Sequence, residues 1–181
     1  MTSETRSRRL VCLTGFMGCG KSTTAVLLAR QIGWPVVDLD RKIEEATTLT
    51  IPEIFTRFGE FEFRKMEADQ LIRAVSEFSS LDKPCIFSLG GGTLTQPRNV
   101  AFLREHRATI IWLECPVEQL LFRCAQVTNR PLFRDEASFR KLYEERLSSY
   151  AQADYRVDSN VEPTKVVEQI LGLGIFPEVA A

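Results

Sequence analysis

Short apolar runs alternate with helical patterns along almost the whole chain. The apolar runs predict buried strands at 10–13, 35–39, 85–89, 109–113 and 155–157. Between these runs, apolar side chains recur at helical spacing. This spacing predicts helices over 21–32, 41–46, 52–58, 60–78, 97–105, 116–125, 136–150 and 163–171. Five short strands joined by helical crossovers are typical of an α/β protein with a parallel sheet, whose ligands gather beyond the carboxyl ends of the strands.

The length and composition of the chain restrict the class of protein. With 181 residues, 44% hydrophobic and 26% charged, the chain is long enough for one packed domain and too short for two ordinary ones. We therefore predict a polar tail over 1–9 and a single domain over 10–175. A net charge of −1 gives no broad attraction to nucleic acid or to an anionic membrane, and no stretch approaches the roughly 18 apolar residues of a membrane span. A small-molecule partner is favoured.

The cysteines indicate a reducing compartment. They are five in number and scattered: Cys12, Cys19, Cys85, Cys115 and Cys124. An odd number without metal-ligand spacing, mostly within apolar runs, is typical of buried, reduced thiols in a cytoplasmic protein. Cys19 is the exception, because it falls in a loop that we expect to be open to solvent.

The strongest motif follows the first predicted strand. Gly15-x-x-x-x-Gly20-Lys21-Ser22 matches the phosphate-binding loop at every fixed position, and a helical pattern follows it. In such a loop the backbone N–H groups and the helix N-terminus hold phosphates, the lysine reaches the β- and γ-phosphates, and the serine hydroxyl can ligate Mg²⁺. The alternative is a tight glycine turn with no ligand. We expect contacts with ATP from Gly18, Cys19, Gly20, Lys21, Ser22 and Thr23.

Two carboxylates follow the second predicted strand. Asp38 and Asp40 are two residues apart, so in an extended segment both side chains leave on one face, toward the phosphate-binding loop. One can hold Mg²⁺ through water, and the other can accept or orient the hydroxyl that attacks the γ-phosphate. The alternative is that one or both only cap the helix that begins near residue 41.

The third predicted strand leads into Gly90-Gly91-Gly92. Three residues without side chains, placed where a strand ends, allow a ligand ring to lie against the backbone. The alternative is a flexible turn.

Arginines supply the remaining candidate chemistry. Arg64 and Glu67 are three residues apart on a predicted helix, so the carboxylate can brace a guanidinium that binds an anion, or the two can form an ordinary surface pair. Arg123 and Arg130 flank or occupy a polar loop, over about 124–135, whose composition is typical of a mobile lid that carries a charge-stabilising arginine. Arg146 falls on the helix that follows this loop.

These segments together resemble one family. In chain order they read "GFMGCGKST", "DLDRKIEE", "IPEIFTRFGEFEFRKME", "FSLGGG", "NRPLF" and "ERLSSYAQADYRVD". Over about 10–173 this set is similar to shikimate kinases. The resemblance implies a nucleoside-monophosphate-kinase-like fold with a five-stranded parallel sheet in the order 2-3-1-4-5. It also implies transfer of the ATP γ-phosphate to the 3-hydroxyl of shikimate, a step of chorismate and aromatic amino-acid biosynthesis.

The resemblance implies a role for each matching residue. For catalysis these are Lys21, Asp40 and Arg130, and for the adenine side of the ATP site Arg123. Mg²⁺ would be bound by Ser22 and, through water, by Asp38. The residues implied for shikimate are Asp40, Arg64, Gly90, Gly91, Gly92 and Arg146, with Arg64 and Arg146 gripping its carboxylate. A substrate-binding subdomain over about 40–70, a lid over about 124–135 and a monomer are also expected.

The chain departs from the family pattern at two places. A glycine usually stands where this chain has Thr48, and the last arginine motif usually continues through Pro-Leu-Tyr, whereas this chain reads Leu147-Ser148-Ser149-Tyr150. Two alternative functions stay open on the sequence alone. One is another small-molecule kinase of this fold, acting on gluconate or a nucleoside monophosphate, and the other is a non-catalytic nucleotide-binding module.

Overall fold

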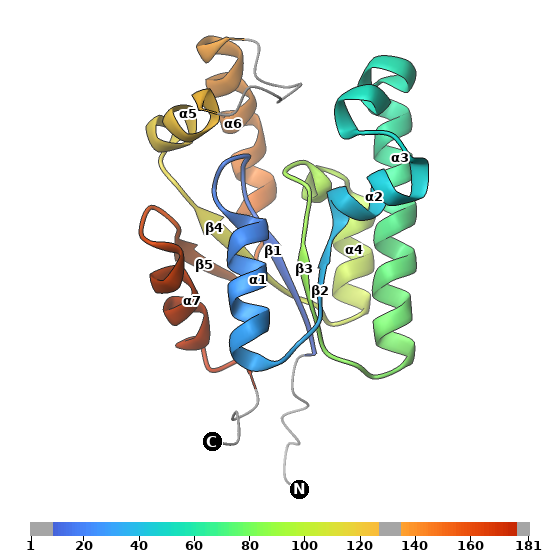
Figure 1. Cartoon of the computed structure of the whole chain (residues 1–181), viewed down its shortest axis with the longest axis vertical. Helices are drawn as coiled ribbons and strands as arrows, with labels where there is room; N and C mark the ends of the chain where they lie inside the picture. Colours follow the sequence, from blue (N-terminus) through green and yellow to red (C-terminus); the bar gives the residue numbers. More distant parts are fainter. Residues whose placement is uncertain (1–8, 127–134, 177–181) are drawn as a thin grey trace, which may run out of the picture.

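The computed structural model describes residues 9–126 and 135–176. Five parallel strands form one sheet in the order β2-β3-β1-β4-β5, which confirms the predicted fold and strand order. The strands are β1 (Leu10–Thr14), β2 (Val36–Asp38), β3 (Cys85–Ser88), β4 (Thr109–Glu114) and β5 (Tyr155–Asp158). Because β1 lies at the centre of the sheet, the loop that follows it opens at the middle of the carboxyl edge (Figure 1).

Seven α-helices and one short 3₁₀ helix accompany the strands in the described residues. They are α1 (Lys21–Ile32), α2 (Leu39–Thr47), α3 (Ile51–Ser80), η1 (Thr93–Thr95), α4 (Pro97–Glu105), α5 (Val117–Ala125), α6 (Glu136–Tyr150) and α7 (Pro163–Leu171). In Figure 1, α1 and α7 lie side by side on one face of the sheet, and α3 packs beside α4 on the opposite face. None of the helices within the described ranges combines the length and the apolar character that a membrane crossing requires.

Two apolar cores hold these layers together. Val11 and Leu13 of β1 belong to a buried cluster with α1 and α7, whereas Leu10 and Cys12 belong to a second cluster with α3 and α4. Successive side chains of a strand point to opposite faces, so this central strand contributes to both cores. The five-residue strand therefore reads as a continuous apolar run, which is the pattern of a strand buried on both faces.

The helices differ from the sequence prediction at the start of α2 and agree with it at the break within α3. The second strand ends at Asp38, and the helix predicted from residue 41 begins already at Leu39, because the Asp38 carboxylate caps it by accepting a hydrogen bond from the backbone N–H of Arg41. The helices predicted at 52–58 and 60–78 correspond to the two parts of α3, because the non-helical backbone of Gly59 separates them at the predicted break. Gly59 has φ 76° and ψ 174°, a backbone conformation that glycine adopts without a steric penalty.

Thr48 ends α2 in the left-handed conformation, with φ 57°. This is the position where the family pattern has a glycine. A β-branched residue in that conformation brings its Cβ close to the backbone, which costs roughly 1–2 kcal/mol. The departure noted in the sequence therefore places local backbone strain between α2 and the start of α3.

Candidate active site

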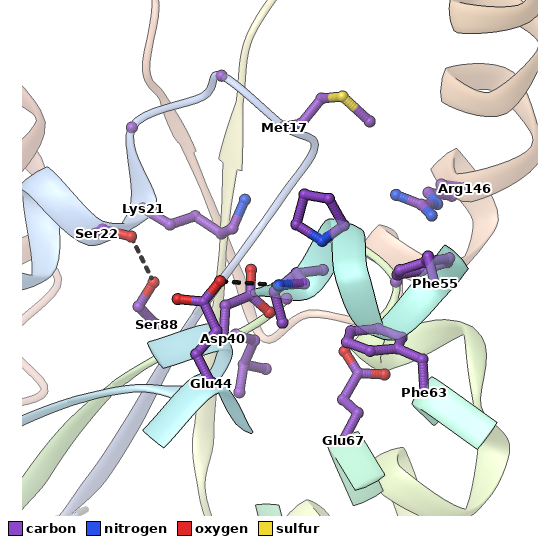
Figure 2. A pocket seen from close by; sticks show the side chains of 18 of the residues that line it. Met17, Lys21, Ser22, Asp40, Glu44, Phe55, Phe63, Glu67, Ser88 and Arg146 are labelled. Atoms are coloured by element: carbon purple, nitrogen blue, oxygen red, sulfur yellow. Dashed lines mark hydrogen bonds between the residues drawn. The ribbon is translucent and has the colours of Figure 1, made fainter. Parts of the chain in front are cut away.

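The loop between β1 and α1 is built to hold an anion. Gly20, the residue before α1, has φ 93°, and no side chain caps this end of the helix. Its first N–H groups are therefore left for a ligand. Lys21 extends back over the loop, where its Nζ donates hydrogen bonds to the carbonyl oxygens of Gly15 at 2.8 Å and Phe16 at 3.0 Å. The loop thus places one ammonium group beside the free helix end (Figure 2).

Cys19 lies inside the loop, and the expectation that it is open to solvent is wrong. Its side chain is 2% exposed, and its Sγ lies 2.8 Å from the point that a Cβ on Gly15 would occupy. The phosphate-binding loop therefore packs the Cys19 sulfur inward against its own backbone. The other four cysteines are buried, as predicted.

Ser22 and Asp38 form a hydroxyl–carboxylate pair at the start of α1. Ser22 Oγ donates to Asp38 Oδ2 at 2.6 Å and lies 3.3 Å from the hydroxyl of Ser88, at the end of β3. Oxygen ligands of these types suit Mg²⁺, so the residues fit the ion that the sequence implies. Asp38 also caps α2, as the capping interpretation predicted, and its role toward Mg²⁺ stays a prediction.

Asp40 reaches the same region by a different route from the one predicted. It lies in the first turn of α2, not in an extended segment, so the alternation of a strand does not explain its direction. The residue is exposed at the cavity, but protein atoms crowd its carboxylate on the other sides. This burial, reinforced by the negative charge of Glu67 and opposed by Lys21, raises the pKa of Asp40 to about 6.

One cavity of about 590 Å³ joins these groups beyond the carboxyl ends of the strands. Figure 2 shows Lys21 on one side of it and Arg146 on the other. Sequence reasoning did not assign several residues that line it: Met17, Glu44, Ile51, Pro52, Phe55, Phe63 and Ser88. The apolar ones follow the helical spacing of core residues, and no separate sequence signal distinguishes a pocket wall from the core.

Arg64 and Glu67 form a buried ion pair at the far end of the cavity. Arg64 Nη1 donates to Glu67 Oε2 at 2.9 Å, and Nη2 donates to the more exposed Glu60 at 3.0 Å. Burial alone would lower the pKa of Arg64, but the charges and hydrogen bonds of the two glutamates outweigh it and raise the pKa above its ordinary value. The interpretation as a solvated surface pair is therefore wrong.

Arg146 lines the same cavity from α6. It is 5% exposed, and its guanidinium lies 5.6 Å from the centre of the Phe16 ring. Among residues 9–126 and 135–176, no carboxylate forms an ion pair with it. A buried guanidinium without such a partner creates a strong preference for an anionic ligand.

The three consecutive glycines leave room for the charged side chains of the cavity. A Cβ on Gly92 would lie 2.3 Å from Arg64 Nη2, and one on Gly90 would lie 2.6 Å from Glu67 Oε1 and 3.0 Å from Asp40 Oδ1. At Gly91 the nearest atom would be Arg146 Nη1, at 3.2 Å. The sequence prediction assigned this space to a ligand ring; the structure shows that the protein's own charged groups already require it.

Of the remaining predicted arginines, Arg123 lies beside the phosphate-binding loop. Arg123 of α5 donates to the carbonyl oxygens of Gly18 and Ser159, both at 3.3 Å, and so connects α5 to the phosphate-binding loop. Arg130 and most of the predicted lid lie outside the described residues.

This arrangement suits phosphoryl transfer to a small anion. The phosphate-binding loop lies at one end of the cavity, two buried guanidinium groups lie at the other, and the Asp40 carboxylate also lines it. Such a site can hold a nucleoside triphosphate and a hydroxylated carboxylic acid together.

Comparisons with known proteins agree with this geometry. The family model described as shikimate kinase matches residues 17–173. A shikimate kinase of Geobacter metallireducens is 37% identical over 174 residues, which cover 94% of each chain. The solved shikimate kinase of Acinetobacter baumannii, in complex with shikimate, superposes with a TM-score of 0.80 at 33% identity and covers 93% of this chain and 94% of its own. A gluconokinase of Sinorhizobium meliloti, at 17% identity and a TM-score of 0.57 over 94% and 93%, shares the fold alone.

Proposed function

The chain belongs to the shikimate kinase family, and we propose that it transfers the γ-phosphate of ATP to the 3-hydroxyl of shikimate, giving shikimate 3-phosphate and ADP. The observation that carries this proposal is the single cavity that contains both the phosphate-binding loop and two buried arginines. A gluconate kinase or a nucleoside-monophosphate kinase would use a different acceptor pocket. A protein that only binds nucleotide would not require the ionisable carboxylate of Asp40 in the cavity between the phosphate-binding loop and the two arginines.

The acceptor is held by its carboxylate. Arg64 and Arg146 bind this group, and the backbone of 90–92 lies against the ring. The substrate hydroxyl attacks the γ-phosphorus, its proton passes to the carboxylate of Asp40, and the bond to the β-phosphate oxygen breaks with ADP as the leaving group. The raised pKa of Asp40 makes it a better proton acceptor than an ordinary aspartate, while leaving it ionised at neutral pH.

The nucleotide is held by the loop and α1. Lys21 exchanges its two carbonyl partners for phosphate oxygens, and Arg123 lies toward the adenine. Ser22, directly, and Asp38, through water, are the residues that would hold Mg²⁺. When bound, the ion neutralises charge on the β- and γ-phosphates.

The proposal also covers the domain organisation, the oligomeric state and the cellular location of the protein. It includes a single domain over 10–175, a substrate-binding subdomain over about 40–70, and a lid over about 124–135 whose Arg130 meets the transferring phosphoryl group. A closing lid excludes water, which would otherwise compete with the substrate hydroxyl. It also includes a monomer, supported by a cavity that one chain lines, and a cytoplasmic location, supported by five buried cysteines.

The test is ADP release by the purified protein with ATP and Mg²⁺. Shikimate, quinate, gluconate and a panel of nucleoside monophosphates are compared as acceptors, together with a reaction without acceptor. Strong stimulation by shikimate alone is expected. Release with another acceptor and none with shikimate would refute the acceptor assignment, and silence with all of them would favour the binding module.

A further inference from the structure

The Glu67 carboxylate has a second buried partner besides Arg64. Thr93 Oγ1 donates a hydrogen bond of 2.7 Å to Glu67 Oε1, while Arg64 Nη1 binds Oε2 at 2.9 Å. Thr93 and Glu67 are both 0% exposed, so water does not supply either bond. Thr93 therefore fixes the orientation of the carboxylate plane through Oε1. That orientation determines where Oε2 binds the Arg64 guanidinium.

Thr93 is itself held from two directions. Its backbone N–H donates to the carbonyl oxygen of Gly90 at 3.1 Å, which closes the turn after β3. Its carbonyl oxygen accepts a hydrogen bond of 3.0 Å from Nδ2 of Asn99, a residue of α4 that is 1% exposed. A continuous buried chain thus runs from α4 through η1 and α3 to the guanidinium that faces the cavity.

Loss of the threonine hydroxyl would leave Glu67 Oε1 without a donor. A buried charged acceptor in that state is costly, so the carboxylate would rotate to share Arg64 between its two oxygens. The guanidinium would then turn with it. The space around it is narrow, since the Cβ point of Gly92 is 2.3 Å from Arg64 Nη2, so a small rotation changes which N–H groups face the cavity.

We infer that Thr93 is a positioning residue for the acceptor carboxylate, acting through Glu67 on Arg64. The inference rests on the proposed function, because it concerns the affinity for shikimate. In the described part of the chain, Thr93 forms no hydrogen bond with the phosphate-binding loop, so its effect falls on the acceptor and not on the nucleotide.

The experiment replaces Thr93 by valine, which keeps the shape and removes the hydroxyl. Thr109→Val is the matched control, because Thr109 is also 0% exposed and its hydroxyl has no hydrogen-bond partner in the described structure. Thr93→Ser is the rescue variant, because it restores the donor. For each protein, KM for shikimate, KM for ATP and kcat are measured, with calorimetric titration of shikimate and a thermal melt.

The expected result is a KM for shikimate raised about tenfold in Thr93→Val, with KM for ATP and kcat within about twofold of the parent. Thr109→Val should match the parent, and Thr93→Ser should recover most of the affinity. Thr93→Ala provides the same readout if the valine variant does not fold. Equal shikimate affinity in parent and variants, or equal losses for shikimate and ATP, would overturn the inference. The activity of the unmodified protein with shikimate is measured first, because a protein that does not use shikimate would refute the proposed function itself.

Discussion

Arg64 Nη1 and Glu67 Oε2 lie 2.9 Å apart in a part of the cavity wall where the glutamate is completely buried. This pair makes Arg64 a preorganised cation whose charge is already compensated. Arg146, across the same cavity, has no such partner in the described part of the chain. The two arginines are therefore expected to differ in what they contribute to folding, although both would bind the same carboxylate.

Removal of Arg64 should impair both binding and folding. Arg64→Met should raise KM for shikimate roughly 100-fold, because a charge-assisted contact is lost. It should also lower the free energy of unfolding by about 3 kcal/mol, because Glu67 is left buried without its cation. Steady-state kinetics and denaturant unfolding measure the two effects. Arg73→Met, at an exposed position of the same helix, serves as the control.

Removal of Arg146 should weaken shikimate binding without destabilising the fold. Arg146→Met should also raise KM for shikimate roughly 100-fold. The free energy of unfolding should rise by on the order of 1 kcal/mol, because an uncompensated buried charge is replaced by an apolar side chain of similar length. Denaturant unfolding of this variant beside Arg64→Met checks the sign. A destabilisation equal to that of Arg64→Met would contradict the difference between the two residues.

Gly92→Ala should displace the Arg64 guanidinium. Gly92 has φ −112°, so alanine meets no backbone strain there, and the effect comes from the Cβ that would lie 2.3 Å from Arg64 Nη2. KM for shikimate should rise at least tenfold, with KM for ATP unchanged. Gly172→Ala is the control, because the nearest atoms to its Cβ are at 3.4 Å and its φ is −64°. Unchanged shikimate kinetics in Gly92→Ala would show that this space is not required.

Asp40 should give activity and stability opposite dependences on pH. Because its pKa is raised to about 6, kcat should fall as the pH drops below that value and the proton acceptor becomes protonated. The folded protein binds this proton more tightly than the unfolded chain, in which the pKa of Asp40 has its ordinary value of 3.8. The charged carboxylate therefore lowers the stability of the fold above about pH 6. This cost is lost as the pH falls from about 6 toward 3.8.

Asp40→Asn tests both halves of that expectation. The variant should lose turnover at every pH while melting higher than the parent at pH 8, and the difference in melting temperature should shrink toward pH 4. Rate profiles and thermal melts over this range provide the data. A variant that melts below the parent at pH 8, or a parent whose rate is flat through pH 6, would refute the assigned pKa.

Thr48→Gly should stabilise the fold. Glycine removes the roughly 1–2 kcal/mol of left-handed strain at φ 57° and loses about 0.5–1 kcal/mol through the greater freedom of the unfolded chain. The net gain should be a few tenths of a kcal/mol to about 1 kcal/mol, seen as a higher denaturant midpoint. Thr47→Gly, one residue earlier and inside α2, should destabilise instead.

The fold was predictable because its signals are local. The apolar runs that become β1, β3 and β4 are buried on both faces, and a glycine-rich loop between strand and helix fixes the topology around β1. Asp40 shows the limit of such reasoning: the sequence predicted its place in the cavity, but the strand alternation used for this was wrong, since α2 begins one residue after Asp38.

Tertiary contacts account for what could not be predicted. The burial of Arg64 depends on the turn at 90–92 and on Thr93, both far from it in sequence, and no spacing along α3 distinguishes a buried pair from an exposed one. Phe55 and Phe63 follow helical spacing like core residues, and only the bend at Gly59 and the packing of α3 bring them to the cavity wall. Cys19 Sγ lies in the space that a side chain on Gly15 would occupy, an arrangement that no local pattern encodes.

The central claim is that this chain phosphorylates shikimate at its 3-hydroxyl, and identification of the product tests it most directly. The protein is incubated with ATP, Mg²⁺ and shikimate, and the product is identified by mass spectrometry and by phosphorus and proton NMR. The account predicts one new compound, one phosphoryl group heavier than shikimate, with the phosphorus coupled to the proton at C3. Unchanged shikimate in a sample that phosphorylates gluconate or a nucleoside monophosphate, or a phosphate at another hydroxyl, would contradict it.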